Sequence, residues 1–287
     1  MNEYQHRKRE ILGSLRAEIG PKVNKISKYS STPNVKAKMV NEIISECRAS
    51  LLTSVNYLSK NEREIESLII QYCCSVVSLE YRNQVFPYEY MAFSRRVGEL
   101  WECFCKTAWD YPVNDSVCRI QPPNFINVKS MIIDRIRSNL GNNPSSNDVM
   151  SDVNKLCDVI GNINMKEDEV FRKDDIPHVI DFKSGFGSNE KGNMLRLLAV
   201  GKAYKIWDSR TQLMLLIRQN DNNHYLNSLR NSRIWDVHTG LDSYKKIKEI
   251  TGSDIENVLK IINWESDFSN NFYEFLVRYN LTKYLDW

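Results

Sequence analysis

Acidic and basic residues gather around one short apolar run in residues 167–193, "EDEVFRKDDIPHVIDFKSGFGSNEKGN". In a β-strand alternate residues share a face, so Asp181 and Lys183 of "VIDFK" point the same way while their apolar neighbours point to the other side. Asp168 lies 181 − 168 = 13 residues upstream. A hairpin that turns near residues 174–175 would bring Asp168 opposite Asp181, and two carboxylates and an ammonium group would then converge.

Such a cluster suits the cleavage of a phosphodiester bond. Mg²⁺ prefers carboxylate oxygen and keeps several waters, so one or two Asp residues are enough to hold it against a substrate phosphate. The ion polarises the phosphoryl oxygen, lowers the pKa of a bound water and stabilises the leaving 3′ oxygen. Lys183 would neutralise charge on the phosphate or orient the attacking water. The alternative is a solvent-facing pair of Asp181 and Lys183, worth less than about 1 kcal/mol.

The segment "DEVFRKDDIPHVIDFKSG" resembles the PD-(D/E)xK motif of nucleases, and the layout of about residues 90 to 240 resembles type II restriction endonucleases. The resemblance implies that Asp168 and Asp181 are catalytic acids that bind Mg²⁺. It implies that Lys183 is the catalytic lysine and that Glu99 of "RRVGELWE" is a further catalytic acid on a helix. The expected enzyme cleaves double-stranded DNA at a specific sequence.

The resemblance also implies a homodimer, because a palindromic site calls for a two-fold symmetric pair of active sites. We expect the two subunits to meet through helical surface outside residues 165–240. Two other functions stay open: a repair or junction-resolving nuclease of the same fold, and a helical DNA-binding or scaffold protein in which the D-x-K residues have no role.

The segment departs from the family's pattern at the first acid. No proline precedes Asp168, which stands between Glu167 and Glu169, so either neighbour could be the metal acid instead. Asp158 in "LCDVIG" is another candidate, although its apolar neighbours have helical spacing. The sequence leaves the first metal acid open among these four residues.

The glycines of "SGFGSNEKGN" do not form a phosphate-binding loop of the nucleotide-binding kind, because the lysine and hydroxyl residue that must follow the last glycine are missing. A loop rich in Ser, Asn and Lys beside a cleavage site is better interpreted as reaching the DNA. Asn and Lys can contact base edges in the major groove, and Ser can contact a phosphate. The candidates for DNA binding are Ser184, Asn189, Lys191 and Asn193.

The elements that must position these residues follow from apolar periodicity. The predicted helices are 59–81, 88–109, 127–140, 147–161, 190–207 and 222–232, with more in the first sixty residues and after 252. The predicted strands are 168–173, 177–183, 212–219 and 233–240, with a further short strand at 117–120. This order predicts an α/β (α+β) fold, a mixed central β-sheet flanked by helices. We expect one domain, with an N-terminal helical region (1–87), a core like that of restriction endonucleases (88–250) and C-terminal helices (251–287).

Composition narrows the functional classes. The net charge is only +3, but residues 1–60 hold 11 Lys+Arg against 5 Asp+Glu, a balance of +6 that is compatible with a polyanionic partner. The seven cysteines and four histidines lack the spacing of a zinc site, and the cysteines are typical of reduced thiols. No apolar run approaches the roughly 20 residues of a membrane span, and no secretory signal is visible. We therefore expect a cytoplasmic protein with no membrane association.

Overall fold

The computed structural model describes residues 3–141, 143, 145–185, 191–220 and 224–287. The chain divides into two compact units. The helical unit comprises Met1–Asp115 and Gly240–Trp287, and the sheet unit comprises Ser116–Thr239. Each unit is described by itself.

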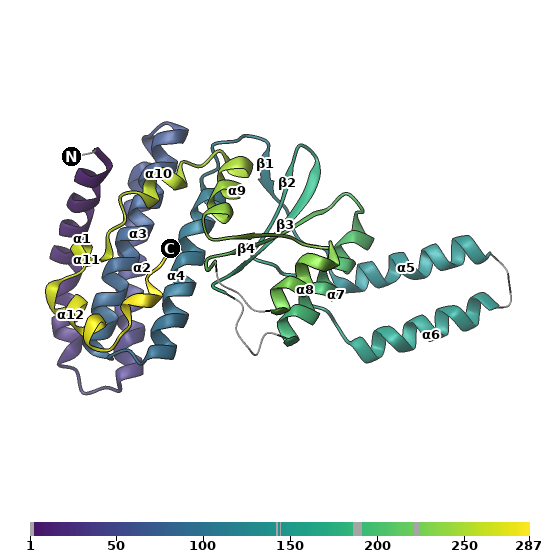
Figure 1. The fold of residues 1–287 in the computed structure, drawn as a ribbon, viewed down its shortest axis with the longest axis horizontal. Coiled ribbons are helices and arrows are strands. Elements are labelled where there is room, and N and C mark those ends of the chain that lie inside the picture. Colours follow the sequence, from purple (N-terminus) through teal and green to yellow (C-terminus); the bar gives the residue numbers. More distant parts are fainter. Residues whose placement is uncertain (1–2, 142, 144, 186–190, 221–223) are drawn as a thin grey trace. The chain divides into compact units, whose positions relative to one another are not determined.

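The sheet unit is built on five strands in the order of the chain: β1 (Val117–Arg119), β2 (Glu169–Lys173), β3 (Ile176–Lys183), β4 (Gln212–Ile217) and β5 (Asp236–Thr239) (Figure 1). β2 is antiparallel to both of its neighbours, β1 and β3, whereas β3, β4 and β5 are parallel. The sheet is therefore mixed, as the sequence predicts.

A two-residue turn fixes the register of the β2–β3 hairpin. Asp174 and Asp175 have φ values of 50° and 61°, the left-handed conformation that two-residue hairpin turns require and that Asp tolerates better than most residues. Lys173 pairs with Ile176, and the register runs on to Glu169 opposite Ile180. The predicted hairpin is confirmed, and its register, continued by one residue beyond Glu169 and Ile180, places Asp168 beside Asp181.

Four helices complete the sheet unit: α5 (Phe125–Leu140), α6 (Ser145–Ile160), α7 (Lys191–Trp207) and α8 (His224–Ser232). Parallel strands need crossover connections, and α7 and α8 supply them between β3, β4 and β5. The core of this unit forms where α5, α7 and α8 pack on the strand residues Val170, Val179, Leu213, Leu215 and Ile217. Asp181 and Lys183 are two and four residues beyond Val179, so they share the face that α7 covers.

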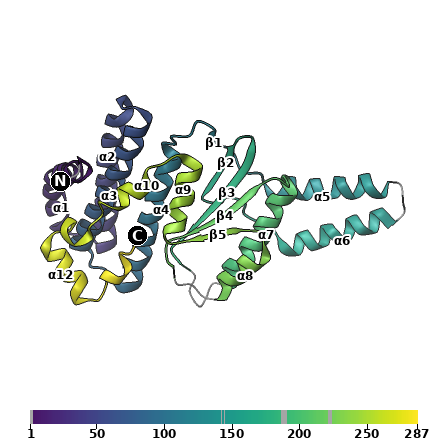
Figure 2. The same cartoon turned by 45° about the horizontal axis from the view of Figure 1, so that its top comes forward.

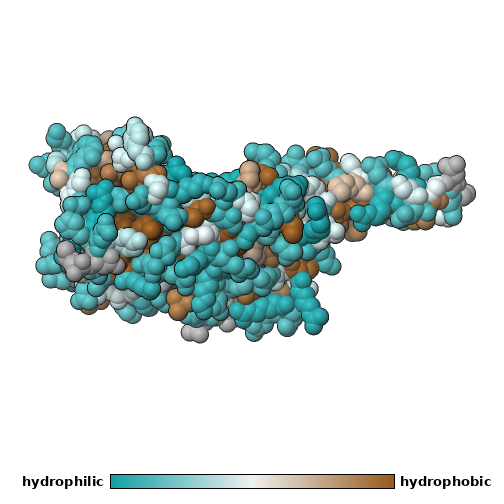
Figure 3. Space-filling view, turned by 90° about the horizontal axis from the view of Figure 1, so that it is seen from above, coloured by the Kyte–Doolittle hydropathy of each residue, from teal (hydrophilic) through white to brown (hydrophobic). Residues whose placement is uncertain are grey.

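A helical hairpin of α5 and α6 projects from the rest of the sheet unit (Figures 1 and 2). Along its surface apolar side chains are interspersed among hydrophilic ones (Figure 3). Both helices carry partly buried apolar side chains, such as Ile132 and Val153, and exposed ones, such as Ile126 and Leu156.

The helical unit is organised around α3 (Lys60–Val85), which is buried along most of its length. α1 (Glu3–Ser27), α2 (Pro33–Ser54) and α4 (Tyr90–Asp110) pack beside it. The predicted start of α3 at Ser59 is confirmed, because the Glu62 carboxylate accepts a hydrogen bond of 3.1 Å from the backbone N–H of Ser59. The remaining elements are short: a 3₁₀ turn (Val55–Tyr57), α9 (Leu241–Thr251), α10 (Ile255–Leu259), α11 (Trp264–Asp267), α12 (Asn270–Arg278) and a second 3₁₀ turn (Thr282–Tyr284).

The C-terminal segment is tied to the N-terminal helix by a buried polar network. Asp267 accepts hydrogen bonds of 2.7 Å from both Lys8 Nζ and the Tyr72 hydroxyl. A buried carboxylate satisfied by two donors from α1 and α3 fixes the end of the chain against these helices.

The unit boundaries differ from those drawn on the sequence. α4 packs on α3, and α9 packs on α4 and α10, so the helical unit takes in residues up to 115 and resumes at 240. The predicted core of residues 88–250 includes α4 and residues 241–251, for which no helix was predicted and which form α9. No helix among the described residues combines the length and the apolar character that a bilayer span needs.

Candidate active site

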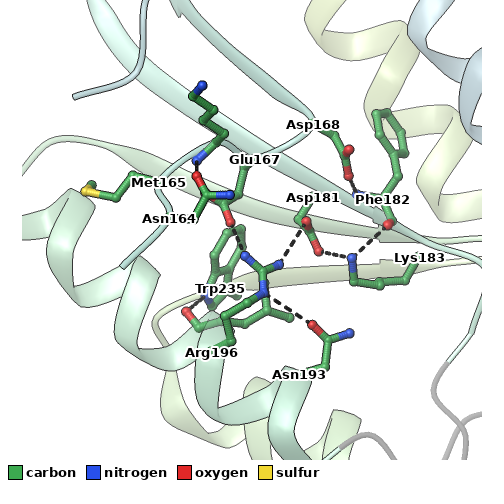
Figure 4. Close-up of polar contacts among 12 residues, drawn as sticks. Asn164, Met165, Glu167, Asp168, Asp181, Phe182, Lys183, Asn193, Arg196 and Trp235 are labelled. Carbon is green, nitrogen blue, oxygen red and sulfur yellow. Dashed lines mark hydrogen bonds and ion pairs between the residues drawn. The ribbon is translucent and has the colours of Figure 1, made fainter. Parts of the chain in front are cut away.

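The hairpin brings the predicted acids and lysine together (Figure 4). Asp168 Oδ2 accepts a hydrogen bond of 2.7 Å from the backbone N–H of Phe182, which fixes its carboxylate at the end of β3. Lys183 Nζ lies 2.6 Å from Asp181 Oδ2 and donates to the Phe182 carbonyl oxygen at 3.2 Å. The lysine therefore lies beside the acidic pair, on the same face of the sheet.

Helix α7 adds an arginine that the sequence analysis did not single out. Arg196 Nη1 lies 2.6 Å from Glu167 Oε1, and Nη2 lies 3.4 Å from Asp181 Oδ1. The Tyr204 hydroxyl, about two turns further along α7, donates to the carbonyl oxygen of Met165 and so holds the segment that carries Glu167. Figure 4 shows the guanidinium between the two carboxylates.

The cluster is largely buried and carries a net negative charge when all its groups are ionised. The residues Glu167, Asp168 and Asp181 carry three negative charges when ionised, and Lys183 and Arg196 carry two positive charges, so 2 − 3 leaves −1. Asp181 is 4% exposed and Glu167 is 8% exposed. Burial, reinforced by the repulsion of neighbouring carboxylates, raises the pKa of Glu167 to about 7 and also raises the pKa of Asp181. The fully ionised cluster would be stabilised by one more positive charge.

Two carboxylate oxygens are available to such a charge. Glu167 Oε2 is buried and makes no hydrogen bond within the described part of the chain. Asp181 Oδ2 is buried likewise, and its close neighbour is the Lys183 ammonium, in an ion pair that lacks hydrogen-bond geometry. The described residues contain no group of three or more His, Cys, Asp or Glu side chains placed to hold a metal ion. Two carboxylates nevertheless suit Mg²⁺, which takes its other ligands from water and phosphate.

Comparisons with protein-family models, curated proteins and solved structures found no match to this chain. What the cluster does must therefore be inferred from its own chemistry. That chemistry is three carboxylates gathered at the hairpin, Glu167, Asp168 and Asp181, with Lys183 paired to Asp181 and Arg196 paired to Glu167 and Asp181.

The structure places the alternative first acids in different surroundings. Glu169 lies on the opposite face of β2 from Asp168, and its carboxylate accepts two hydrogen bonds of 2.7 Å from the Arg119 guanidinium. Asp158 is exposed on α6, 3.1 Å from Lys129 Nζ. Of the four candidates, Asp168 and Glu167 are the two that lie with Asp181.

Glu99, the predicted helix acid, lies on α4 in the helical unit. Its carboxylate is paired with two cations of the same helix, Arg95 at 3.4 Å and Arg96 at 3.2 Å. Both arginines are one helical turn away, as the spacing of residues 95, 96 and 99 dictates. Its assignment as a catalytic acid stays a prediction.

The predicted DNA-binding residues lie around the carboxyl end of β3. The Ser184 hydroxyl accepts hydrogen bonds from the buried Arg218 guanidinium at 3.2 and 2.8 Å. Lys191 is exposed at the first position of α7, and Asn193 Oδ1 accepts a bond of 3.5 Å from Arg196 Nε. Asn189 lies outside the described residues.

A signal for Arg196 was present in the sequence. It stands four residues before Val200 and seven before Ala203, two buried residues of α7, so it shares their helix face. An arginine on the apolar face of a helix that covers a sheet favours an acidic partner, because a partly buried charge is costly when it is unpaired. The acids of the neighbouring hairpin were the natural partners.

Proposed function

We propose that this chain is a Mg²⁺-dependent endodeoxyribonuclease that cuts double-stranded DNA at a specific sequence, as a type II restriction enzyme does. The observation that carries the proposal is that the β2–β3 hairpin brings Asp168 to the end of β3, where it accepts a hydrogen bond from the Phe182 N–H, next to Asp181 and Lys183. This is the arrangement that the resemblance to PD-(D/E)xK nucleases implies.

Asp168 and Asp181 would hold the ion, with Glu167 as the third carboxylate within reach. The raised pKa values of Glu167 and Asp181 support this role, because a bound cation relieves the repulsion that contributes to them. Bound there, Mg²⁺ would act as a Lewis acid on the phosphate and would lower the pKa of a water molecule. The two acids fix where the scissile phosphate must lie, next to the carboxyl end of β3.

Lys183 would act on the substrate directly. Its ammonium group has three donors, one of which bonds to the carbonyl oxygen of Phe182, and the ion pair with Asp181 keeps the group beside the acids. A further donor would bind a phosphate oxygen or the attacking water. Arg196 would keep Asp181 and Glu167 at a fixed separation by contacting both.

The proposed substrate determines the proposed assembly and location. A palindromic duplex presents two equivalent strands, so we propose a homodimer in which each subunit cuts one of them. All seven cysteines are free thiols, which suits a protein of the reducing cytoplasm.

Digestion of phage DNA tests the proposal. We expect discrete fragments in Mg²⁺ or Mn²⁺, and binding without cleavage in Ca²⁺, because catalysis needs a reactive water on a hard cation. Undiminished cleavage in EDTA would overturn the metal mechanism. Smeared products or selective cutting of branched DNA would indicate a repair nuclease, and salt-sensitive binding without any cutting would indicate a non-catalytic DNA-binding protein.

A further inference from the structure

A hollow of about 260 Å³ opens on the helical unit, lined by residues of α2, α3 and α4. One wall is formed by residues 34, 37, 38 and 41 of α2, and another by residues 92, 95, 96 and 99 of α4. Each set has the i, i+3, i+4, i+7 spacing of one helix face. The volume is many times the about 30 Å³ that a water molecule takes in the liquid, so a ligand of several atoms fits.

Positive charge dominates the lining of this hollow. One carboxylate, that of Glu99, faces four cations: Lys38, Arg82, Arg95 and Arg96. Glu99 is already shared between Arg95 and Arg96, and Lys38 lies 3.9 Å from Glu42, which is outside the lining. Even with Glu42 counted, 4 − 2 leaves +2. Burial, with a contribution from the charges of Arg96 and Arg95, lowers the pKa of Arg82, as expected where cations crowd together.

The lining of the hollow also includes a buried tyrosine whose hydroxyl proton has no acceptor. Tyr88 is 6% exposed, and no described residue accepts a hydrogen bond from its hydroxyl. Arg82 lies over its ring at 4.3 Å, and the guanidiniums of Arg82 and Arg96 carry donors only, so neither can accept the phenol proton. Burial raises the pKa of Tyr88 to about 12, so the hydroxyl keeps its proton at neutral pH. A donor without an acceptor therefore points to a ligand that supplies one.

We propose that this hollow binds an oxyanion of the phosphate class, held by the Tyr88 hydroxyl and by the guanidiniums of Arg82, Arg95 and Arg96. A guanidinium presents parallel N–H donors that match two phosphate oxygens, and charge-assisted bonds of this kind are the strong ones. Either a free phosphorylated compound or the backbone of a nucleic acid carries these oxygens. The proposal does not depend on the nuclease activity, because every residue of the hollow belongs to the helical unit.

Equilibrium binding to the full-length protein in EDTA tests the site, with pyrophosphate as one probe and a short DNA duplex as the other. Tyr88→Phe removes the hydroxyl but keeps the ring, and Arg95→Gln removes an exposed cation. Each is expected to weaken binding of the same probe about tenfold, the effect of one charge-assisted hydrogen bond. Tyr29→Phe and Lys25→Gln are the matched controls, since both residues are exposed in the helical unit and neither lines the hollow.

The two probes distinguish the source of the phosphate. Saturable pyrophosphate binding that both variants weaken identifies a free phosphorylated ligand. If both variants lose affinity for the DNA duplex alone, the ligand is a backbone phosphate. In that case Arg95→Gln should also release about one counterion fewer on binding DNA, as measured from the salt dependence of the affinity. Glu99→Gln should tighten binding of the same probe, because it frees Arg95 and Arg96 from their competing carboxylate. If Tyr88→Phe and Arg95→Gln bind both probes as their controls do, the site does not exist.

Discussion

Asp181 is held between a lysine on its own strand and an arginine on the covering helix. Lys183 lies 2.6 Å from one of its oxygens, and Arg196 lies 3.4 Å from the other. Such a carboxylate is oriented by its neighbours, yet burial opposes its charge and raises its pKa. This combination of fixed geometry and costly ionisation is common at functional sites.

Asp181→Asn and Lys183→Met should each reduce DNA cleavage by several orders of magnitude while leaving the fold intact. Residues that act as one catalytic unit lose nearly all activity when one is removed, and both substitutions nearly conserve side-chain volume. For Asp181→Asn the melting temperature should hold or rise, because the buried charge is removed. Fragment formation in Mg²⁺ and thermal unfolding are the measurements. Asp158→Asn, an exposed acid in contact with Lys129, is the control that should keep full activity.

The choice between Glu167 and Asp168 as the first metal acid can be made by comparing Asp168→Asn with Glu167→Gln. We expect Asp168→Asn to abolish cleavage, because Asp168 continues the strand register opposite Asp181. Glu167→Gln should leave measurable cleavage with a raised Mg²⁺ requirement, since Glu167 is bound to Arg196 as well. Titration of cleavage rate against Mg²⁺ separates the two. The reverse order of severity would make Glu167 the first acid.

At the scale of elements, the turn between β2 and β3 determines which side chains of the hairpin face the site. A slip of one residue in this hairpin would turn Asp181 and Lys183 to the opposite face, because side chains alternate along a strand. The turn uses Asp at both left-handed positions, where glycine or asparagine is the more common choice.

Asp175→Gly should therefore stabilise the protein by about 0.5–1 kcal/mol, because glycine adopts positive φ without the steric cost that a Cβ carries. Asp175→Ala, which loses the same carboxylate but keeps a Cβ, should destabilise it. Thermal unfolding of the two variants measures the difference, and cleavage by Asp175→Gly should match that of the unaltered protein. Equal melting temperatures for Gly and Ala would contradict the left-handed conformation of this residue.

Helix α3 is attached to the C-terminal segment by a second buried acid, Glu64. Its carboxylate accepts hydrogen bonds from the Ser253 hydroxyl and, at 3.2 Å, from the backbone N–H of Asp254. Burial outweighs these bonds and raises the pKa of Glu64 to about 7. The pKa of Glu64 in the folded protein thus exceeds its ordinary value of 4.5. Protonated Glu64 therefore stabilises the fold fully below pH 4.5, and this stabilisation is lost as the pH rises through about 7.

Glu64→Gln should remove this pH dependence. We compare the free energy of unfolding of Glu64→Gln with that of the unaltered protein at pH 5 and at pH 8. The difference, variant minus unaltered protein, should be about 2–3 kcal/mol larger at pH 8, since each pKa unit is worth ~1.4 kcal/mol. Urea unfolding at the two pH values provides the comparison. Glu62→Gln is the control. Hydrogen bonds from Ser59 lower the pKa of this exposed acid, so it is ionised at both pH values. The difference in free energy of unfolding between Glu62→Gln and the unaltered protein should therefore be the same at pH 5 and pH 8.

For the molecule as a whole, the sequence predicts what is local and misses what long-range packing decides. The mixed sheet and the meeting of Asp168 with Asp181 follow from periodicity and from one turn at residues 174–175, signals that span a few residues each. The contact of Arg196 with Glu167 and the hollow around Tyr88 depend on how helices pack, which periodicity does not encode. The return of the chain to the helical unit at residue 240 is likewise invisible, because no change of composition marks it.

We propose the α5–α6 hairpin as the surface through which the expected homodimer forms. Exposed apolar side chains lie along it, with Ile126 66% and Leu156 60% exposed. α5 carries three cations and one acid, and α6 carries one cation and three acids, so the two helices have charges of 3 − 1 = +2 and 1 − 3 = −2. In a two-fold pair, α5 of one subunit can lie against α6 of the other, which brings opposite charges together and buries both apolar edges in a four-helix bundle.

Leu156→Lys should therefore weaken the dimer at least tenfold, because it places a charge in the apolar seam of the bundle. Leu241→Lys is the matched control, a leucine 67% exposed on α9 of the helical unit, and it should leave the dimer unchanged. Light scattering over a range of protein concentrations measures the dissociation constant of each variant. If the seam joins the subunits, Leu156→Lys should also lose cleavage of palindromic sites in proportion to its loss of dimer. An unaltered protein that is monomeric both free and bound to DNA would rule out this assembly.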